Sequence, residues 1–93
     1  MITIKKLTAM PYAQAHVEIT DGGEISLFSY VTRVAVIDED GYLTVNGLYS
    51  MTTRKHISAF LKEYSPMITF QMAKDMIGNY KMHIECGDII ELE

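Results

Sequence analysis

The pattern of apolar and polar positions divides the chain into a β-rich first half and a helical stretch that follows it. In the first half, apolar residues recur at every second position, which is typical of strands that bury one face. These runs stop at clusters of turn-forming residues such as Asp21-Gly22-Gly23, Asp38-Glu39-Asp40-Gly41 and Asn46-Gly47. The stretches predicted to be extended are residues 1–7, 15–20, 24–30, 34–37, 42–45, 80–86 and 89–93.

A helical period replaces the alternation after Gly47. Ile57, Phe60, Leu61 and Tyr64 fall at positions i, i+3, i+4 and i+7, so they form one apolar stripe on a helix. The helix is expected to end at Ser65-Pro66, because a residue before proline is pushed out of the α region. The pattern therefore predicts a main helix over about residues 53–64.

Hydroxyl side chains mark the expected start of this helix. Ser50, Thr52 and Thr53 can each accept a hydrogen bond from a free N–H group of the first turn, so one of them is expected to be the cap. A second short helix is predicted over about residues 70–77, with Thr69 as its cap and Gly78-Asn79 at its end.

Short alternating segments joined by tight turns predict an antiparallel β-meander of about four to six short strands. The main helix buries its apolar stripe by packing on one face of this sheet. The expected fold class is therefore α+β, in two layers, and residues 1–93 are expected to form a single domain.

Composition restricts the setting of the protein. Cys86 is the only cysteine, which excludes an intramolecular disulfide and fits a reducing compartment. No apolar run is long enough to span a membrane, and the opening MITIKK lacks the apolar segment of a signal peptide. We therefore expect a cytoplasmic protein without membrane contact. A net charge of −4 argues against indiscriminate binding of nucleic acid.

The residues that catalysis or metal binding requires do not form a recognisable group. His16, His56 and His83 are far apart in the sequence, and none lies in a catalytic motif. His83 and Cys86 supply only two metal ligands, whereas a structural zinc site needs four. We therefore expect no enzymatic activity, no metal and no cofactor.

The polar face of the predicted helix is the first candidate for partner binding. Arg54 and Lys55 lie near the helix start, where the free N–H groups and the helix dipole attract anions. Cations at this end of a helix depart from the usual preference for acidic residues, which hints at a functional role. The alternative is that a threonine only caps the helix and the basic residues are simply solvated. The candidate residues are Thr52, Thr53, Arg54, Lys55, His56 and Lys62.

An acidic surface is the second candidate. Turns at the same end of a meander lie side by side, so their carboxylates can form one acidic edge that faces a basic protein surface. The alternative is that these residues only provide solubility. The residues of this candidate surface are Asp21, Glu24, Asp38, Glu39 and Asp40.

Two stretches resemble a family of small proteins of unknown function from bacteriophages, prophages and gut bacteria of the Firmicutes type. The stretches are Ser29-Tyr30-Val31-Thr32-Arg33-Val34-Ala35 and Tyr49-Ser50-Met51-Thr52-Thr53-Arg54-Lys55-His56-Ile57, followed by Phe60-Leu61. The shared pattern is S-Y-x-T-x-V-A, then Y-S-x-T-T-x-x-H-I-x-x-F-L, and it covers residues 29–61. The resemblance implies a mobile-element setting and carries no activity with it.

These observations favour a small phage or mobile-element accessory protein that binds a macromolecular partner. The expected partner is a host protein in the bacterial cytoplasm, such as a defence nuclease that the protein inhibits in the manner of an anti-CRISPR. The alternative is a regulatory module that binds nucleic acid through the basic start of the main helix, with affinity that falls as salt rises. Formation of a homodimer through the first or last strand is compatible with both hypotheses.

Overall fold

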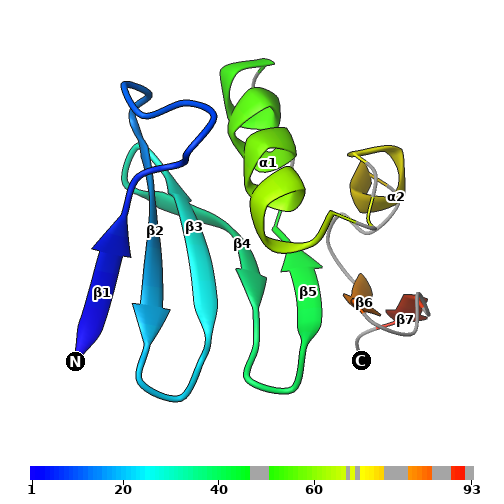
Figure 1. The fold of residues 1–93 in the computed structure, drawn as a ribbon. Coiled ribbons are helices and arrows are strands. Elements are labelled where there is room, and N and C mark those ends of the chain that lie inside the picture. The colour runs from blue at the N-terminus through cyan, green and yellow to red at the C-terminus, as the bar shows by residue number, and fades with distance from the viewer. Residues whose placement is uncertain (47–50, 67, 69, 75–79, 85–88, 92–93) are drawn as a thin grey trace.

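The computed structural model describes residues 1–46, 51–66, 68, 70–74, 80–84 and 89–91 (Figure 1). Its strands are β1 (Ile2–Lys5), β2 (Ala15–Thr20), β3 (Ile25–Ser29), β4 (Thr32–Ile37), β5 (Tyr42–Val45), β6 (Tyr80–His83) and β7 (Ile89–Glu91). Its helices are α1 (Met51–Tyr64) and α2 (Phe70–Lys74). The α+β class predicted from the sequence is confirmed.

The described strands form one antiparallel sheet in which spatial order follows chain order from β1 to β7. This is the predicted meander, with seven strands instead of the expected four to six because both C-terminal strands join the sheet. In such a meander every second turn lies at the same end. The β2–β3 and β4–β5 turns therefore share one end of the sheet, and the β3–β4 turn lies at the other end (Figure 1).

One face of the sheet carries the core. The register pairs Val17 with Leu27, and Leu27 with Ala35, so apolar side chains of successive strands lie side by side on this face. Leu27 pairs with Ala35 but Phe28 pairs with Arg33, so β4 has a β-bulge in which Val34 is the extra residue. Val34 is fully buried. The core is completed by residues from both helices, from the segment between them and from the connector after β1, in particular Leu7, Ile57, Phe60, Leu61, Ile68 and Ala73.

Helix α1 lies across β3 and β4 (Figure 1). Ile57, Phe60 and Leu61 are almost completely buried and Tyr64 is half-buried, as the predicted stripe requires. Burial of each of the first three contributes about 2 kcal/mol at most. The helix begins at Met51, two residues before the predicted start.

The earlier start changes the assignment of the helix cap. Thr52 and Thr53 lie within the first turn, so neither of them is the residue that precedes the helix, and the prediction for these two is wrong. Ser50, the third candidate, lies outside the described residues.

The opposite face of the sheet has no helix packed on it in the described part of the chain. Its side chains instead pack against one another across strands. His16 and Phe28 stack with ring centroids 4.9 Å apart, and Tyr42 meets His83 edge to face at 4.6 Å. The Lys81 ammonium lies 4.3 Å from the centre of the Tyr42 ring. These pairs leave the rings half-buried without a second layer.

The C-terminal elements are described only in part. Helix α2 is described from Phe70, its predicted start, to Lys74, and the rest of the predicted helix lies outside the described residues. Strand β6 ends at His83 instead of Cys86. The expected cap Thr69, the expected helix end at Gly78-Asn79, and Cys86 lie outside the described residues. Strand β1 is also shorter than the predicted stretch 1–7, because Leu7 belongs to the buried start of the connector that leads to β2.

Candidate partner-binding end

Three buried polar side chains join the β3–β4 turn to the start of α1. The hydroxyl oxygen of Ser29 lies 2.8 Å from His56 Nδ1 and 3.1 Å from the hydroxyl oxygen of Thr53. All three residues are at most 5% exposed. Because the Ser29 hydroxyl has one proton and two acceptor lone pairs, it can satisfy both neighbours at once. Burial also lowers the pKa of His56 below 6.5, which favours the neutral ring.

This contact between a serine and a histidine has the length found between a nucleophile and its base. The two side chains are closed off from solvent, however, with Ser29 3% and His56 1% exposed. A substrate has no access to the hydroxyl, so in this structure the arrangement works as a tie between sheet and helix.

Tyr30 follows the tie in an unusual backbone conformation. Its φ is +58°, in the left-handed region that side chains other than glycine rarely adopt. Its N–H donates to the carbonyl oxygen of Gln14 at 2.7 Å, and its ring lies 6.2 Å from the His56 ring. Tyr30 as a whole is nevertheless 56% exposed, and the neighbouring Val31 is 93% exposed. The turn thus presents an aromatic and a β-branched side chain to solvent.

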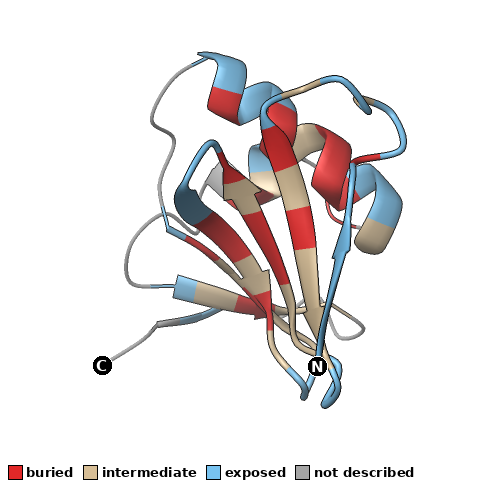
Figure 2. Cartoon of the chain, turned by 90° about the vertical axis from the view of Figure 1, so that its left-hand side faces the viewer, coloured by how far each residue is buried: buried red, intermediate tan, exposed pale blue. Residues whose placement is uncertain are grey.

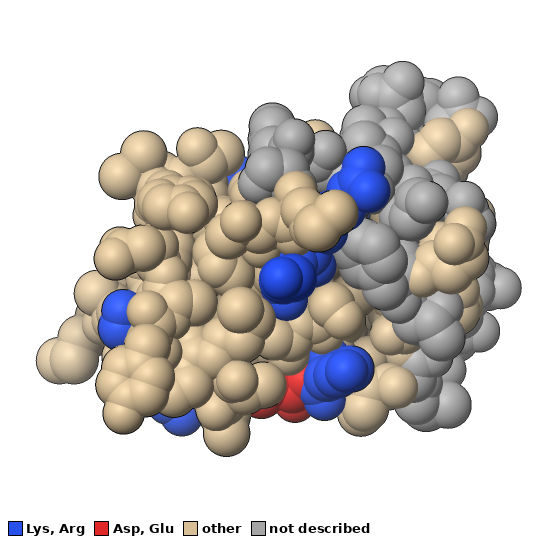
Figure 3. Space-filling model, turned by 90° about the horizontal axis from the view of Figure 1, so that it is seen from above, with Lys and Arg blue, Asp and Glu red and all other residues tan. Residues whose placement is uncertain are grey.

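Exposed cations lie beside this turn, at the start of α1. Thr52, Arg54 and Lys55 are exposed, and Met51 is 72% exposed. Within the described residues, no ion pair joins Arg54 or Lys55 to a carboxylate. Viewed from this end, Lys and Arg side chains are spread over the surface and little Asp or Glu surface is visible (Figure 3). We call Tyr30, Val31, Met51, Arg54 and Lys55 the basic end of the molecule.

The six residues proposed from the sequence are therefore not all placed on one surface. Thr52, Arg54 and Lys55 are exposed at the basic end, whereas Thr53 and His56 are buried in the tie to Ser29. Lys62 lies in the last turn of α1, about 12 Å along the axis from Arg54. It lines an open hollow of about 290 Å³ with Thr8, Ala9, Ala59 and Glu63.

Helical spacing contains a signal for the two buried residues. Thr53 lies four residues before Ile57, and His56 lies four residues before Phe60, so both belong to the side of the helix that carries the apolar stripe. The sequence analysis instead counted Thr53 among the possible helix caps, and both residues among the candidates for partner binding. Tyr30 and Val31, in contrast, have no periodic signal that marks them as exposed.

The acidic turns lie at the end of the sheet away from the basic end (Figure 1). The β2–β3 and β4–β5 turns meet there, since a Cβ atom added at Gly22 would collide with the Glu39 carboxylate. Asp38 accepts hydrogen bonds from the N–H groups of Asp40 and Tyr42, and Glu24 lies 3.9 Å from Arg33. Asp38 and Glu24 are therefore engaged in contacts of the fold.

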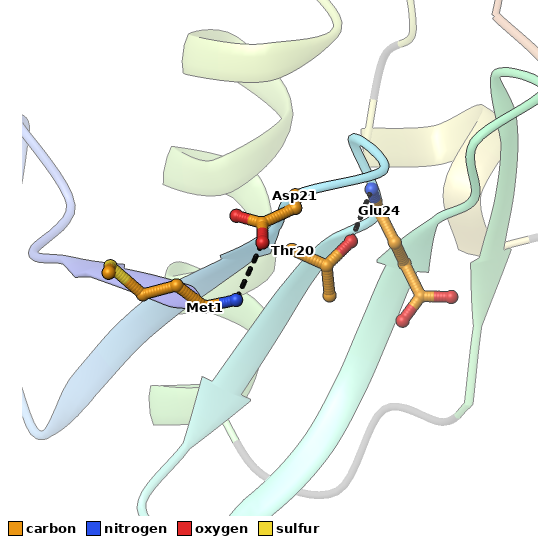
Figure 4. A network of polar contacts seen from close by, with 4 residues as sticks. All are labelled: Met1, Thr20, Asp21 and Glu24. Carbon is orange, nitrogen blue, oxygen red and sulfur yellow. Dashed lines mark hydrogen bonds and ion pairs between the residues drawn. The ribbon is translucent and has the colours of Figure 1, made fainter.

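Asp21 has a contact of its own. Its carboxylate lies 2.6 Å from the amino group of Met1, and beside it the Thr20 hydroxyl accepts a hydrogen bond from the Glu24 N–H (Figure 4). In the described part of the chain, no three His, Cys, Asp or Glu side chains are placed to hold a metal ion. His83 Nε2 lies 3.1 Å from the Asp40 carbonyl oxygen, a contact that holds β6 against the β4–β5 turn.

Comparison with known proteins gives one match. Residues 3–84 match the model of a family of unknown function, DUF8033, which extends on both sides of the resemblance seen over residues 29–61. No curated protein and no solved structure matches the chain. No helix among the described residues is long and apolar enough to cross a membrane. Because the match covers most of the chain, the protein belongs to the DUF8033 family.

Proposed function

We propose that the protein acts by binding a macromolecular partner through its basic end. The observation that carries the proposal is Tyr30, whose backbone is held at a φ of +58° while the residue remains 56% exposed. A non-glycine residue in this conformation costs about 1–3 kcal/mol, and such strain is concentrated at functional sites. Glycine would adopt this backbone conformation without strain. The presence of tyrosine at this position therefore indicates that its exposed ring has a role that outweighs the strain.

The composition of the basic end supports a protein partner. Tyrosine, methionine and arginine are enriched in protein–protein interfaces, and tyrosine and arginine are enriched among the residues that dominate binding. Tyr30 and Met51 supply apolar contact area, and Arg54 and Lys55 supply positive charge. The partner surface that fits is an apolar pocket with acidic residues around it.

Rigidity is the second support. The tie from Ser29 to His56 fixes the turn against α1, and the Tyr30 N–H is fixed to Gln14. A preorganised surface loses little conformational entropy on binding. Because the chain resembles phage proteins, a host protein is the first class of partner to test. This class includes a defence nuclease that the protein would inhibit.

The test compares variants as baits in a bacterial host lysate. Tyr30→Gly should retain or raise the stability of the fold, because it relieves the backbone strain, and should weaken partner capture at least about tenfold. Arg54→Glu, which changes an exposed residue, should weaken capture similarly. Glu39→Lys is the matched control, because it also reverses the charge of an exposed residue, at the opposite end of the molecule.

Three outcomes distinguish the hypotheses. A protein captured by the wild type and Glu39→Lys, but lost with Tyr30→Gly and Arg54→Glu, supports the proposal. Capture that is lost only with Glu39→Lys overturns it and assigns binding to the acidic turns. Capture that disappears after nuclease treatment and falls steeply with salt overturns the protein partner in favour of nucleic acid.

A further inference from the structure

The uncovered face of the sheet is partly open to solvent. Along β2, Val17 on the helix side is buried, whereas His16 and Glu18 on the uncovered side are half-buried (Figure 2). At the two edges of the sheet, Ile4 on β1 and Ile90 on β7 lie on the uncovered side and are 66% and 41% exposed. No helix in the described part of the chain covers these side chains. A second molecule is therefore needed to bury them.

One row of directly opposed residues crosses this face from β1 to β7. In strand order, its members are Ile4, Glu18, Ser26, Val36, Thr44, Lys81 and Ile90. Val36 lies on β4, which is the middle strand of the seven. Glu18 and Lys81 lie on the second strand to either side of β4, and an isoleucine lies at each end of the row. The row therefore has matching apolar ends, and opposite charges at equal distances from its centre.

We propose that the uncovered face packs on the same face of a second copy of this chain, with a two-fold axis parallel to β4. This axis places each strand over the strand that lies equally far on the other side of β4. Glu18 then faces the partner subunit's Lys81, and Ile4 faces the partner subunit's Ile90. Sheets that pack face to face keep their strands within about 30° of each other, and the long lysine side chain can reach across that difference. The interface is self-complementary and closed by symmetry, so it forms a dimer.

The contacts within one copy leave these two charges able to pair with a second copy. His16 Nε2 lies 2.8 Å from Oε2 of Glu18, and a carboxylate accepts hydrogen bonds at both of its oxygens. The Lys81 ammonium lies over an aromatic ring of β5, and an ammonium group has three donors. Arg33 lies on β4, close to the axis, but its guanidinium is 3.9 Å from the Glu24 carboxylate, which offsets its charge within each copy.

The area of the face limits the affinity. Neighbouring strands lie about 4.8 Å apart, so a sheet of seven strands is about 29 Å wide, and a strand of five residues is about 17 Å long. Each copy therefore contributes about 500 Å², and the total of about 1,000 Å² is at the lower end of specific interfaces. We expect a monomer–dimer equilibrium with a Kd of about 10 μM.

The experiment measures molecular mass by sedimentation equilibrium as a function of protein concentration. Glu18→Lys and Lys81→Glu should each raise the Kd at least about tenfold, because each places two pairs of like charges across the interface. The double variant should return the Kd close to the wild-type value. Within one copy the two residues lie four strands apart, about 19 Å, so this recovery requires contact between copies.

A mixture of the two single variants tests the same contact without a double substitution. At a concentration where each variant alone is mainly monomeric, the mixture should form heterodimers with a Kd close to that of the wild type, because opposite charges face each other again. Lys55→Glu is the control for charge reversal, since Lys55 is exposed on α1, on the other side of the sheet. It should change the Kd no more than about twofold.

Two adjacent isoleucines of β7 form a matched pair that tests which face is used. Ile90 is 41% exposed and lies on the uncovered face, whereas Ile89 is 46% exposed and lies opposite Met82, on the helix side. Ile90→Lys should raise the Kd about tenfold, because each dimer loses two apolar contacts. Ile89→Lys should change it no more than about twofold.

Circular dichroism checks that each variant is folded, as expected for positions that are exposed or half-buried. A wild type that stays monomeric at the highest soluble concentration overturns the proposal. A dimer that both charge reversals leave unchanged also overturns it. A dimer that each reversal weakens, but that neither the double variant nor the mixture restores, contradicts the facing of Glu18 and Lys81 and overturns the proposed axis.

Discussion

The hydroxyl oxygen of Ser29 lies 2.8 Å from Nδ1 of His56, and this contact joins the end of β3 to the second turn of α1. The two residues are 27 positions apart in the chain. Between them lie the β3–β4 turn, two strands and the helix start, so the contact determines how the turn and the helix are placed relative to one another. The exposed side chains of the basic end depend on this placement.

Removal of the Ser29 hydroxyl should destabilise the fold. Ser29→Ala leaves a buried imidazole nitrogen without its partner, which should lower the free energy of unfolding by about 1–3 kcal/mol. Ser58→Ala, which changes a half-buried serine of the same helix, should lower it by no more than about 0.5 kcal/mol. Denaturant unfolding of the two variants checks this. Equal effects would show that the Ser29 contact contributes nothing specific.

Stability should fall in mildly acidic solution because of His56. Burial lowers its pKa in the folded state below 6.5, so the unfolded chain binds the proton more readily than the folded one. The contribution is complete above pH 6.5 and is lost as the pH falls from there through the folded-state pKa. The free energy of unfolding should decrease by at most about 1.4 kcal/mol per pH unit in this window.

Denaturant unfolding at a series of pH values on both sides of 6.5 measures this dependence. His56→Gln should flatten the dependence in that window. The same slope in the His56 variant and the wild type would assign the acid sensitivity to other groups.

The two faces of the sheet should respond differently to the loss of a phenyl ring. Phe60 is fully buried between α1 and the sheet, so Phe60→Ala should lower the free energy of unfolding by about 3–5 kcal/mol. Phe28 is half-buried and stacks on His16 on the uncovered face, so Phe28→Ala should cost clearly less. Thermal or denaturant unfolding compares them. A cost for Phe28→Ala as large as that for Phe60→Ala would mean that the second face is also part of a core.

Adjacent glycines of the β2–β3 turn should differ in their tolerance of a side chain. Gly23 has a φ of +100°, and no atom lies within 4 Å of an added Cβ, so Gly23→Ala suffers backbone strain alone. It should destabilise by about 1–2 kcal/mol. At Gly22 the added Cβ meets only the end of the flexible Glu39 side chain, so Gly22→Ala should be close to neutral. The reverse order in an unfolding experiment would contradict the turn geometry.

Local periodicity accounts for the parts of the fold that were predicted correctly. β2 and β5 have the predicted bounds, because alternation and turn residues define both ends of each strand. The burial of the apolar stripe of α1 was predicted because apolar side chains favour burial against any apolar surface, so the prediction did not require knowing which strands lie beneath the helix. The start of α1 was predicted less accurately, because the ends of helices depend on caps and on contacts with the rest of the chain.

The candidate site was predicted only in part. Arg54 and Lys55 are exposed, as expected of charged residues on the polar face of a helix. Thr53 and His56 are buried because Ser29, a residue distant in the sequence, satisfies their hydrogen bonds. Burial of a polar group depends on whether it finds a partner, and a partner of this kind is not visible in local sequence.

The sequence by itself determined the secondary structure, the α+β class and the residues available for the core, since these follow from periodicity and turn chemistry. Only the tertiary structure decided that Tyr30 and Arg54 share one end of the molecule and that Thr53 and His56 are buried. It also decided that β1 is an open edge. The physical reason is that strand order and the packing of α1 bring together residues that are distant in the chain, and local preference does not specify those neighbours.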